Sequence, residues 1–379
     1  MTLAHISTED FHLSDFNAAS PKIVLAIFTL QGGGAERFVL TLAEAFLKLG
    51  FEAHVVCFKN QVHYPIPDGI RVHFLNYQAY RWLPKIWRNP IFARVFDRYV
   101  RQQIGTVQMV ISNLLPVDQV LRYSQLDPIC FVIHNTISKE YALYEQSTSQ
   151  QQRLTQQLHQ IYGHRPCVCV SQGVLDDFLK IFSQHPKITA IHNPIDAEAI
   201  KQQSLAAVDT PADYLVHVGK FKPAKAHDAL IRAYAQSKQT LPLLLVGEGG
   251  LKDDMMALVE QLGLSDRVIF VGFQANPYPY IRQARLMLLS SVFEGFGIVI
   301  AEALALGVPV ISTDCEAGPR ELLPEANLVP VGDTGALAAK IDQAIANTDD
   351  FRSPFDLKLL PDQVAKQYLE HVLGTDFEK

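Results

Sequence analysis

The chain alternates between short apolar runs and longer stretches in which apolar residues recur every three or four positions. Its first unit has an apolar run at Lys22–Phe28, helical spacing over Ala35–Leu49 and a second apolar run at Ala53–Phe58. Short apolar runs are typical of buried parallel strands, and Gly50 is suited to end the helix between them. The unit therefore predicts a βαβ motif.

The same alternation continues along the chain. In the first half we expect further strands at Val107–Ser112, Ile129–His134, Cys167–Ser171 and Ile188–Ile191. In the second half we expect strands at Tyr214–Val218, Leu243–Val246, Val268–Val271, Leu286–Leu289 and Val308–Ser312, and helices at Ala226–Gln236, Leu251–Leu262, Ile298–Leu306 and Gly335–Ile345. This order predicts an α/β fold with parallel, doubly wound sheets, whose ligands bind beyond the carboxyl ends of the strands.

The pattern divides into two Rossmann-like domains. A length of 379 residues suits two domains, and the turn-forming segment His192–Asp196 predicts a hinge between them. We assign residues 1–20 to a disordered lead-in, residues 21–194 to an N-terminal domain and residues 195–379 to a C-terminal domain. A helix predicted at Pro361–Leu373 could pack against either domain.

Composition excludes several classes of protein. With 48% hydrophobic and 19% charged residues the chain is globular, and its net charge of −6 gives no argument for nucleic-acid binding. Five scattered cysteines argue against a disulfide framework. Cys167 and Cys169 fit a buried strand better than a metal pair. Without a secretory signal or a membrane-length apolar run, we expect a cytoplasmic protein, free or peripheral on the cytoplasmic face of a membrane.

The glycine turn at 32–34 invites comparison with a dinucleotide-binding loop. That fingerprint needs a third glycine where this chain has Arg37, and an acidic residue where the second strand is followed by Lys59. A nicotinamide site is therefore disfavoured. Two interpretations stay open: a tight turn, or a backbone that a ligand can approach at a helix N-terminus.

Charged residues in the second half follow strands. Lys220, Lys222 and Lys225 share one loop, and Gly247 and Gly272 end the next two strands. Clustered lysines are commonly solvated, but a strand-to-helix loop is also where an anion binds.

The segment 294–302 carries the strongest signal. Glu302 lies in an otherwise apolar helix, so its carboxylate needs a partner. Vicinal sugar hydroxyls are two suitable donors, and Phe296, Gly297 and Ile298 offer free N–H groups at the helix start.

These segments resemble the retaining glycosyltransferases of family 4, which have the GT-B fold of two Rossmann-like domains facing across a cleft. The resemblance covers roughly residues 22–345 and rests on four segments: 32–37, 219–225, the two glutamates of 294–302, and 307–314. Glutamates separated by seven residues in this context are specific, whereas either glutamate alone is not.

The resemblance implies roles for named residues. Glu294 would hold donor-sugar hydroxyls and Glu302 the ribose hydroxyls. Lys220 and Lys225 would neutralise the diphosphate, although the family commonly has arginine where this chain has Lys220. The remaining implied contacts to the donor are Gly33, Gly34 and His134 in the first half, and Gly247, Gly272, Phe273, Gly295, Phe296, Gly297 and Ile298 in the second. His134, which could equally be a core histidine, would bond the sugar or the β-phosphate. We expect Glu294, His134 and Lys225 to be the catalytic residues.

The resemblance also implies chemistry. The nucleotide sugar would react by front-face displacement with retention onto a glycan or lipid-linked acceptor of a surface polysaccharide, lipopolysaccharide or capsule. The sequence has no D-x-D pair of the kind that holds a divalent ion in transferases of the GT-A fold, so we expect no metal or other cofactor. A sugar-nucleotide 2-epimerase of the same fold and a non-catalytic sugar-binding protein remain alternatives. The loop Ser312–Glu321 resembles that of members using UDP-hexoses or UDP-N-acetylhexosamines, although Arg320 could only brace this loop.

Residues 81–104 combine basic and aromatic side chains. The basic residues are Arg81, Lys85, Arg88, Arg94, Arg98 and Arg101, and the aromatic residues are Trp82, Trp87, Phe92 and Phe96. This pairing suits an anionic membrane surface. A core-facing helix with a solvated basic side explains the pattern equally well.

Overall fold

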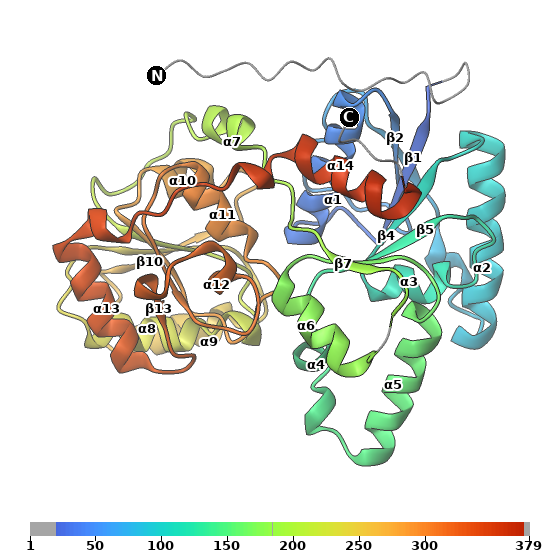
Figure 1. Cartoon of the computed structure of the whole chain (residues 1–379). Helices are drawn as coiled ribbons and strands as arrows, with labels where there is room; N and C mark the ends of the chain where they lie inside the picture. The colour runs from blue at the N-terminus through green and yellow to red at the C-terminus, as the bar shows by residue number, and fades with distance from the viewer. Residues whose placement is uncertain (1–19, 184, 375–379) are drawn as a thin grey trace.

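The computed structural model describes residues 20–183 and 185–374, which form two lobes side by side (Figure 1). Except for Ser20, the lead-in expected at 1–20 lies outside the described residues. Each lobe is an α/β unit around a parallel sheet. The two-domain, doubly wound fold predicted from the sequence is confirmed.

The N-terminal lobe has a seven-stranded sheet in the order β3-β2-β1-β4-β5-β6-β7. Its strands are β1 (Lys22–Ile27), β2 (Glu52–Cys57), β3 (Arg71–Phe74), β4 (Met109–Asn113), β5 (Ile129–Ile133), β6 (Cys167–Cys169) and β7 (Ile188–Ala190). Its helices are α1 (Gly34–Lys48), α2 (Lys85–Tyr99), α3 (Leu115–Leu121), α4 (Ile137–Glu140), α5 (Thr148–Tyr162) and α6 (Gln172–Ile181). Every residue of β4 and β5 is buried, because helices cover both faces of the sheet.

The C-terminal lobe has a six-stranded sheet in the order β10-β9-β8-β11-β12-β13. Its strands are β8 (Leu215–Val218), β9 (Leu243–Val246), β10 (Val268–Gly272), β11 (Leu286–Leu289), β12 (Val310–Thr313) and β13 (Leu328–Val329). Its helices are α7 (Ala197–Gln203), α8 (His227–Gln236), α9 (Lys252–Gln261), α10 (Tyr278–Arg282), α11 (Ile298–Ala305), α12 (Pro319–Leu322) and α13 (Thr334–Ala346). In both sheets the order reverses beside the first strand of the lobe, which is where doubly wound folds bind ligands.

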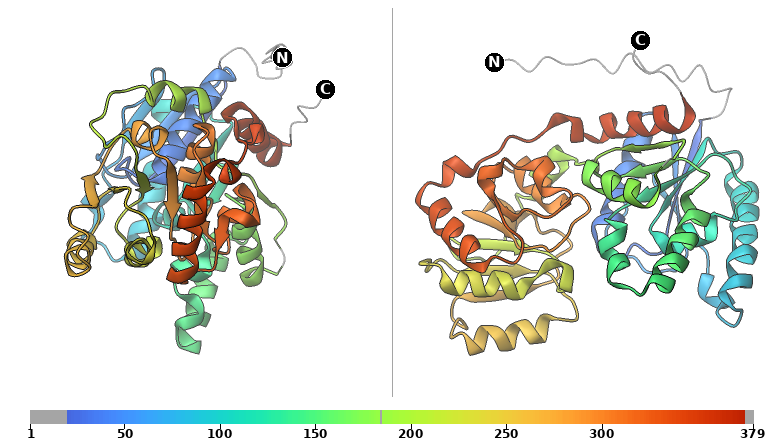
Figure 2. Two further views of the ribbon diagram at one scale, coloured as in Figure 1. Left: turned by 90° about the vertical axis from the view of Figure 1, so that its left-hand side faces the viewer. Right: turned by 60° about the horizontal axis from the view of Figure 1, so that its bottom comes forward.

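The chain passes between the lobes twice. The first crossing joins β7 to α7, where the Asp196 side chain accepts a hydrogen bond from the Ala199 N–H at 2.9 Å. The second crossing leads to α14 (Pro361–Leu373), which lies along the N-terminal lobe (Figure 2). Tyr368 of α14 packs 6.2 Å from the ring of Phe38 in α1. The last helix therefore fastens onto the first domain although it follows the second one in sequence.

Candidate active site

Glu294 lies in the loop after β11 and is held by the loop after β8. Its carboxylate forms an ion pair with Lys225 and accepts a hydrogen bond from Ser291 Oγ at 2.6 Å. The two loops are joined a second time, because Ser290 Oγ donates to the Lys225 carbonyl oxygen at 2.8 Å. Burial alone would raise the pKa of Glu294, but Lys225 and the Ser291 hydrogen bond outweigh it and the pKa lies below its usual value. A buried, charged carboxylate is therefore fixed between the loops that follow β8 and β11.

Glu302 is the second glutamate and belongs to the first turns of α11. Its side chain is 1% exposed, and its Oε1 pairs with Arg37 of the N-terminal lobe and accepts the Tyr278 hydroxyl at 3.2 Å. Its Oε2 is buried and has no hydrogen-bond partner among the residues that the structure describes. The sequence predicted that this carboxylate needs hydrogen-bond partners. Protein groups supply them for Oε1 but not for Oε2.

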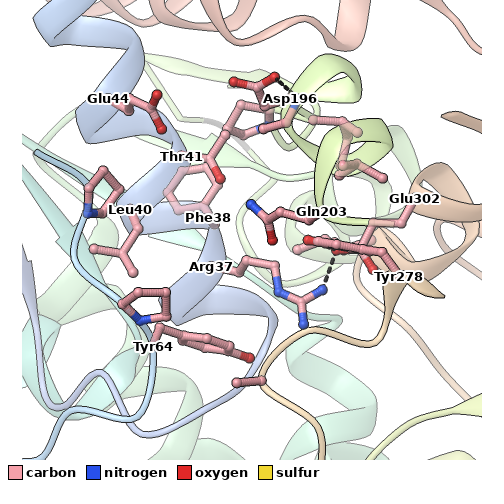
Figure 3. Close-up of a pocket in the computed structure, with 18 residues that line it drawn as sticks. Arg37, Phe38, Leu40, Thr41, Glu44, Tyr64, Asp196, Gln203, Tyr278 and Glu302 are labelled. Carbon is pink, nitrogen blue, oxygen red and sulfur yellow. Dashed lines mark hydrogen bonds and ion pairs between the residues drawn. The ribbon is translucent and has the colours of Figure 1, made fainter. Parts of the chain in front are cut away.

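Arg37 extends from α1 toward Glu302 and Tyr278 (Figure 3). Its guanidinium lies 5.5 Å from the ring centroids of both Tyr64 and Tyr278. Burial would lower the pKa of Arg37, but Glu302 raises it above its usual value, so the side chain stays charged. These residues line one end of a cavity of about 130 Å³ between α1 and the helices α7, α10 and α11.

The glycine turn before α1 faces the C-terminal lobe. A Cβ at Gly34 would lie 3.2 Å from Ile298 Cδ1, and one at Gly33 would lie 3.4 Å from Lys220 Nζ. The Gly33 N–H donates to the Tyr64 hydroxyl at 3.0 Å, which fixes the turn. Gly33 and Gly34 thus come together with Lys220 and Ile298, which follow them in the sequence by more than 180 positions.

Gly295 and His134 meet across the cleft. A Cβ at Gly295 would lie 1.9 Å from the His134 carbonyl oxygen, so only glycine allows this approach. The Gly295 carbonyl accepts Ser171 Oγ at 2.6 Å. The Phe296 ring lies 5.1 Å from that of His192. Gly297, with φ of 81°, turns the chain into α11.

His134 is held in one tautomer by Asn113. The Asn113 Nδ2 donates to the carbonyl oxygens of Ala26 and Ile111, so its Oδ1 is the acceptor that faces His134 Nε2 at 2.9 Å. His134 Nε2 must therefore carry the proton, which leaves Nδ1 as an acceptor. Burial lowers the pKa of His134 to about 3, so the ring is neutral near pH 7.

The three remaining predicted contacts lie at the ends of β9 and β10. Gly247 packs against the backbone of Gly219, and Gly272 packs beside the Glu248 carboxylate. The Phe273 ring is 42% exposed and lies 6.1 Å from the His63 ring of the other lobe. These groups are thus at the same edge as Glu294, on the β10 side.

The loop after β12 contacts the N-terminal lobe. Arg320 forms an ion pair with Asp314 within the same loop, so the bracing role that the sequence left open is what the structure shows. The short helix α12 has four residues. Its Glu321 accepts the N–H groups of Gln172 and Gly173 at 2.8 and 3.0 Å. The loop thus links the lobes beside the glutamate site.

The segment at 81–104 differs in part from its prediction. Phe92 and Phe96 are fully buried in the core, whereas Trp82, Ile86 and Trp87 are 78%, 74% and 64% exposed. The two phenylalanines therefore do not belong to the aromatic surface, because α2 turns them toward the sheet. The basic residues Arg81, Lys85, Arg94, Arg98 and Arg101 are exposed. No helix within residues 20–183 and 185–374 is long and apolar enough to cross a membrane.

Several residues of the site escaped sequence reasoning. They are Tyr64, Asn113, Ser171, Tyr278, Ser291 and Glu321. Arg37 was noted as a departure from a dinucleotide loop and as the last residue of the family-like segment 32–37, but no contact was predicted for it. Apart from Ser291, which contacts Glu294 three positions further on, their partners lie far away in sequence, as with Arg37 and Glu302 at a separation of 265 positions. A spacing pattern carries no signal for such contacts.

Comparison with known proteins agrees with this geometry. The family model for glycosyl transferases group 1 matches residues 197–355, and the model for glycosyltransferase family 4 matches residues 32–199. The N-acetylgalactosamine-N,N'-diacetylbacillosaminyl-diphospho-undecaprenol 4-alpha-N-acetylgalactosaminyltransferase of Campylobacter jejuni is 32% identical over 79% of this chain and 83% of its own.

Solved structures share the fold. HepE of Anabaena in complex with UDP and glucose has a TM-score of 0.67 at 19% identity, covering 93% of this chain and 95% of its own. The lipopolysaccharide outer core galactosyltransferase WaaB has a TM-score of 0.66 at 19% identity, covering 93% and 99%. The two-lobed fold and the two glutamates beyond β11 agree with these matches. The chain therefore belongs to glycosyltransferase family 4 and is a glycosyltransferase with the GT-B fold.

Proposed function

We propose that this glycosyltransferase moves a hexose or N-acetylhexosamine from a UDP-sugar to a glycan or glycolipid acceptor with retention of configuration. One observation carries the proposal: the strand ends of both lobes converge where Glu294 is fixed by Lys225 and Glu302 keeps one buried, unpartnered oxygen. A charged carboxylate and an unsatisfied one match two groups of hydroxyls on one ligand.

The proposed donor lies along the carboxyl edge of the C-terminal sheet. Glu294 accepts the sugar hydroxyls and Glu302 Oε2 accepts a ribose hydroxyl. The diphosphate lies near Lys220 and Lys225, with the N–H groups of Gly297 and Ile298 at the start of α11 as further donors. The backbone at Gly272 and Phe273 contacts the base. Lysines and helix N–H groups can neutralise a diphosphate without a divalent ion.

The tautomer of His134 supports one of its two predicted roles. A phosphate oxygen needs a hydrogen-bond donor, but the Nε2–H is committed to Asn113 and Nδ1 is an acceptor. His134 therefore accepts a hydroxyl of the donor sugar. Because the ring is neutral, it does not supply a proton to the leaving group.

The reaction proposed is a front-face displacement. The acceptor oxygen attacks the anomeric carbon on the side of the leaving phosphate, the bond from that carbon to the phosphate oxygen breaks, and the phosphate takes the acceptor proton. The protein positions both partners and stabilises the charge that develops on the diphosphate. Contacts between the lobes exclude water from the site.

The acceptor proposal draws on the relatives. The Campylobacter jejuni relative is named for a diphospho-undecaprenol substrate, and a Salmonella typhimurium relative, 29% identical over 41% of this chain, is a lipopolysaccharide 1,6-galactosyltransferase. We infer a lipid-linked acceptor in lipopolysaccharide, capsule or related polysaccharide synthesis, at the cytoplasmic face of a membrane. The N-terminal lobe binds it beside His134.

The exposed segment 81–87 and the arginines of α2 form the proposed membrane surface. α2 lies on the side of the N-terminal lobe away from the C-terminal lobe (Figure 1), so docking would leave the cleft free. In sedimentation with anionic vesicles, most of the wild-type protein should move from the supernatant to the pellet. The exposed control Leu357→Ser should behave in the same way, whereas the double variant Trp82→Ser with Trp87→Ser should stay in the supernatant. Equal sedimentation of all three proteins would contradict this surface.

Calorimetry with UDP, GDP, ADP and dTDP tests the donor. UDP should bind most tightly, in the presence of a chelator, and tighter binding of GDP would overturn the choice of base. Transfer abolished by a chelator and restored by magnesium or manganese would contradict metal independence. NMR of the product with a lipid-linked acceptor gives the anomeric configuration, and inversion would refute the mechanism.

A further inference from the structure

Arg37 connects the first helix of the N-terminal lobe with the carboxylate that we assign to ribose. Its partner Glu302 is 265 positions away and on the other lobe. The guanidinium is enclosed by the rings of Tyr64, from its own lobe, and Tyr278, from the opposite lobe. The contact therefore exists only while the lobes are together.

The two oxygens of Glu302 are used differently. Oε1 accepts hydrogen bonds from both Arg37 and the Tyr278 hydroxyl, while Oε2 is buried and accepts none from the described part of the chain. Such an oxygen is costly to leave unpaired, which points to a donor group outside the protein. Arg37 does not occupy that oxygen, so a ligand hydroxyl can bind without displacing it.

We propose that Arg37 is a positioning residue that, on closure of the lobes, fixes Glu302 through Oε1 and presents Oε2 to the ribose hydroxyls of the donor. The inference rests on the proposed nucleotide-sugar site. In this arrangement, closure of the lobes directly affects nucleotide affinity, because the N-terminal lobe supplies the cation that orients Glu302, the group that accepts hydrogen bonds from ribose. Arg37 itself makes no contact with the donor in this arrangement.

The alternative is that the ion pair only latches the lobes. A latch that competes with the nucleotide would strengthen UDP binding when it is removed. A purely structural contact would change UDP affinity without regard to the ribose hydroxyls. Only the positioning role predicts that substitution of Arg37 lowers UDP affinity by an amount that depends on the ribose hydroxyls.

Calorimetry of UDP and of 2′,3′-dideoxy-UDP separates these cases. Arg37→Met should weaken UDP binding about tenfold and leave binding of the dideoxy nucleotide within about twofold, equivalent to ~1.4 and ~0.4 kcal/mol. Lys48→Met is the matched control, because Lys48 lies on the same helix and pairs across the lobes with Asp196 at 3.1 Å, away from Glu302. It should bind both nucleotides as the wild type does.

Each other outcome is decisive. Equal weakening for both nucleotides, or tighter UDP binding by Arg37→Met, overturns the positioning role while leaving the donor site standing. A wild type that binds UDP no better than the dideoxy nucleotide refutes the assignment of ribose to Glu302 and the inference with it. A wild type that binds neither refutes the proposed donor itself.

Discussion

The two lobes present different chemistry to the space between them. The C-terminal lobe contributes fixed charges: Glu294, paired with Lys225, and Glu302. The N-terminal lobe contributes backbone and neutral groups, which are the glycine turn and the His134 ring held by Asn113. The difference suggests that one lobe binds the ionic donor and the other shapes the place where an uncharged hydroxyl attacks. Arg37 is an exception, because it is a cation of the N-terminal lobe that pairs with one of these glutamates.

Removal of a glutamate charge should have the largest effect. Glu294→Gln and Glu302→Gln should each lower kcat/KM by about 100-fold, since hydrogen bonds to a charged group contribute ~1.5–3 kcal/mol each. Glutamine keeps the shape and an amide oxygen that can accept a hydrogen bond from Lys225, whereas alanine at position 294 would leave that ammonium without an acceptor there. Steady-state transfer and circular dichroism should be measured together. Near wild-type turnover in both variants would remove these residues from the site.

Low pH should destabilise the folded C-terminal lobe, because it favours protonation of His227. Neither ring nitrogen has a hydrogen-bond partner within residues 20–183 and 185–374, and burial, with His217 and Lys225 nearby, lowers the pKa of His227 to about 2. From about pH 6.5 down to 2 the unfolded chain holds a proton that the folded ring does not, so stability falls as the pH falls.

His227→Phe tests this linkage. The variant keeps the stack on Phe221, whose ring lies 4.1 Å away. Relative to their difference at pH 7, it should gain ~2 kcal/mol over the wild type at pH 5. Urea unfolding at both pH values measures the gain. His164→Gln, an exposed control, should show none, and an unchanged pH slope in His227→Phe would contradict the buried neutral ring.

Substitution of Lys220 tests whether the charged groups of the C-terminal lobe bind the diphosphate. Lys220→Ala should weaken UDP binding about tenfold, or ~1.4 kcal/mol, by loss of one partly screened cation. Uridine, which lacks the diphosphate, should bind unchanged. The exposed control Lys238→Ala should affect neither ligand. If uridine and UDP weakened equally, Lys220 would be supporting the loop and not the phosphates.

Substitution of His134 tests the neutral groups of the N-terminal lobe and should have the smallest effect on activity. Loss of one neutral hydrogen bond in His134→Phe should lower kcat/KM about fivefold, or ~1 kcal/mol. A deoxy donor that lacks the contacted hydroxyl should be insensitive to the substitution. With its pKa near 3, His134 should add no titration to the wild-type pH profile between pH 5 and 8. A loss that is the same for every deoxy donor would argue for a core role.

The strands themselves could be predicted because their signals are local. All the predicted strands are present, with ends shifted by no more than two residues. The two missed strands lie at sheet edges: β3 is half exposed, and β13 has only two residues. Edge strands lack the continuous apolar run that identifies a buried one.

The sequence by itself determined two α/β lobes, the loops beyond their strands and a family motif of two glutamates. Only the tertiary structure decided what those residues meet: Arg37 on Glu302, Gly295 against His134, Asn113 behind His134, and α14 on α1. It also decided that Phe92 and Phe96 of α2 pack inward while Trp82 and Trp87 do not. The reason is physical. Periodicity reports the surroundings of one element, whereas contacts across a cleft depend on how the two lobes pack against each other.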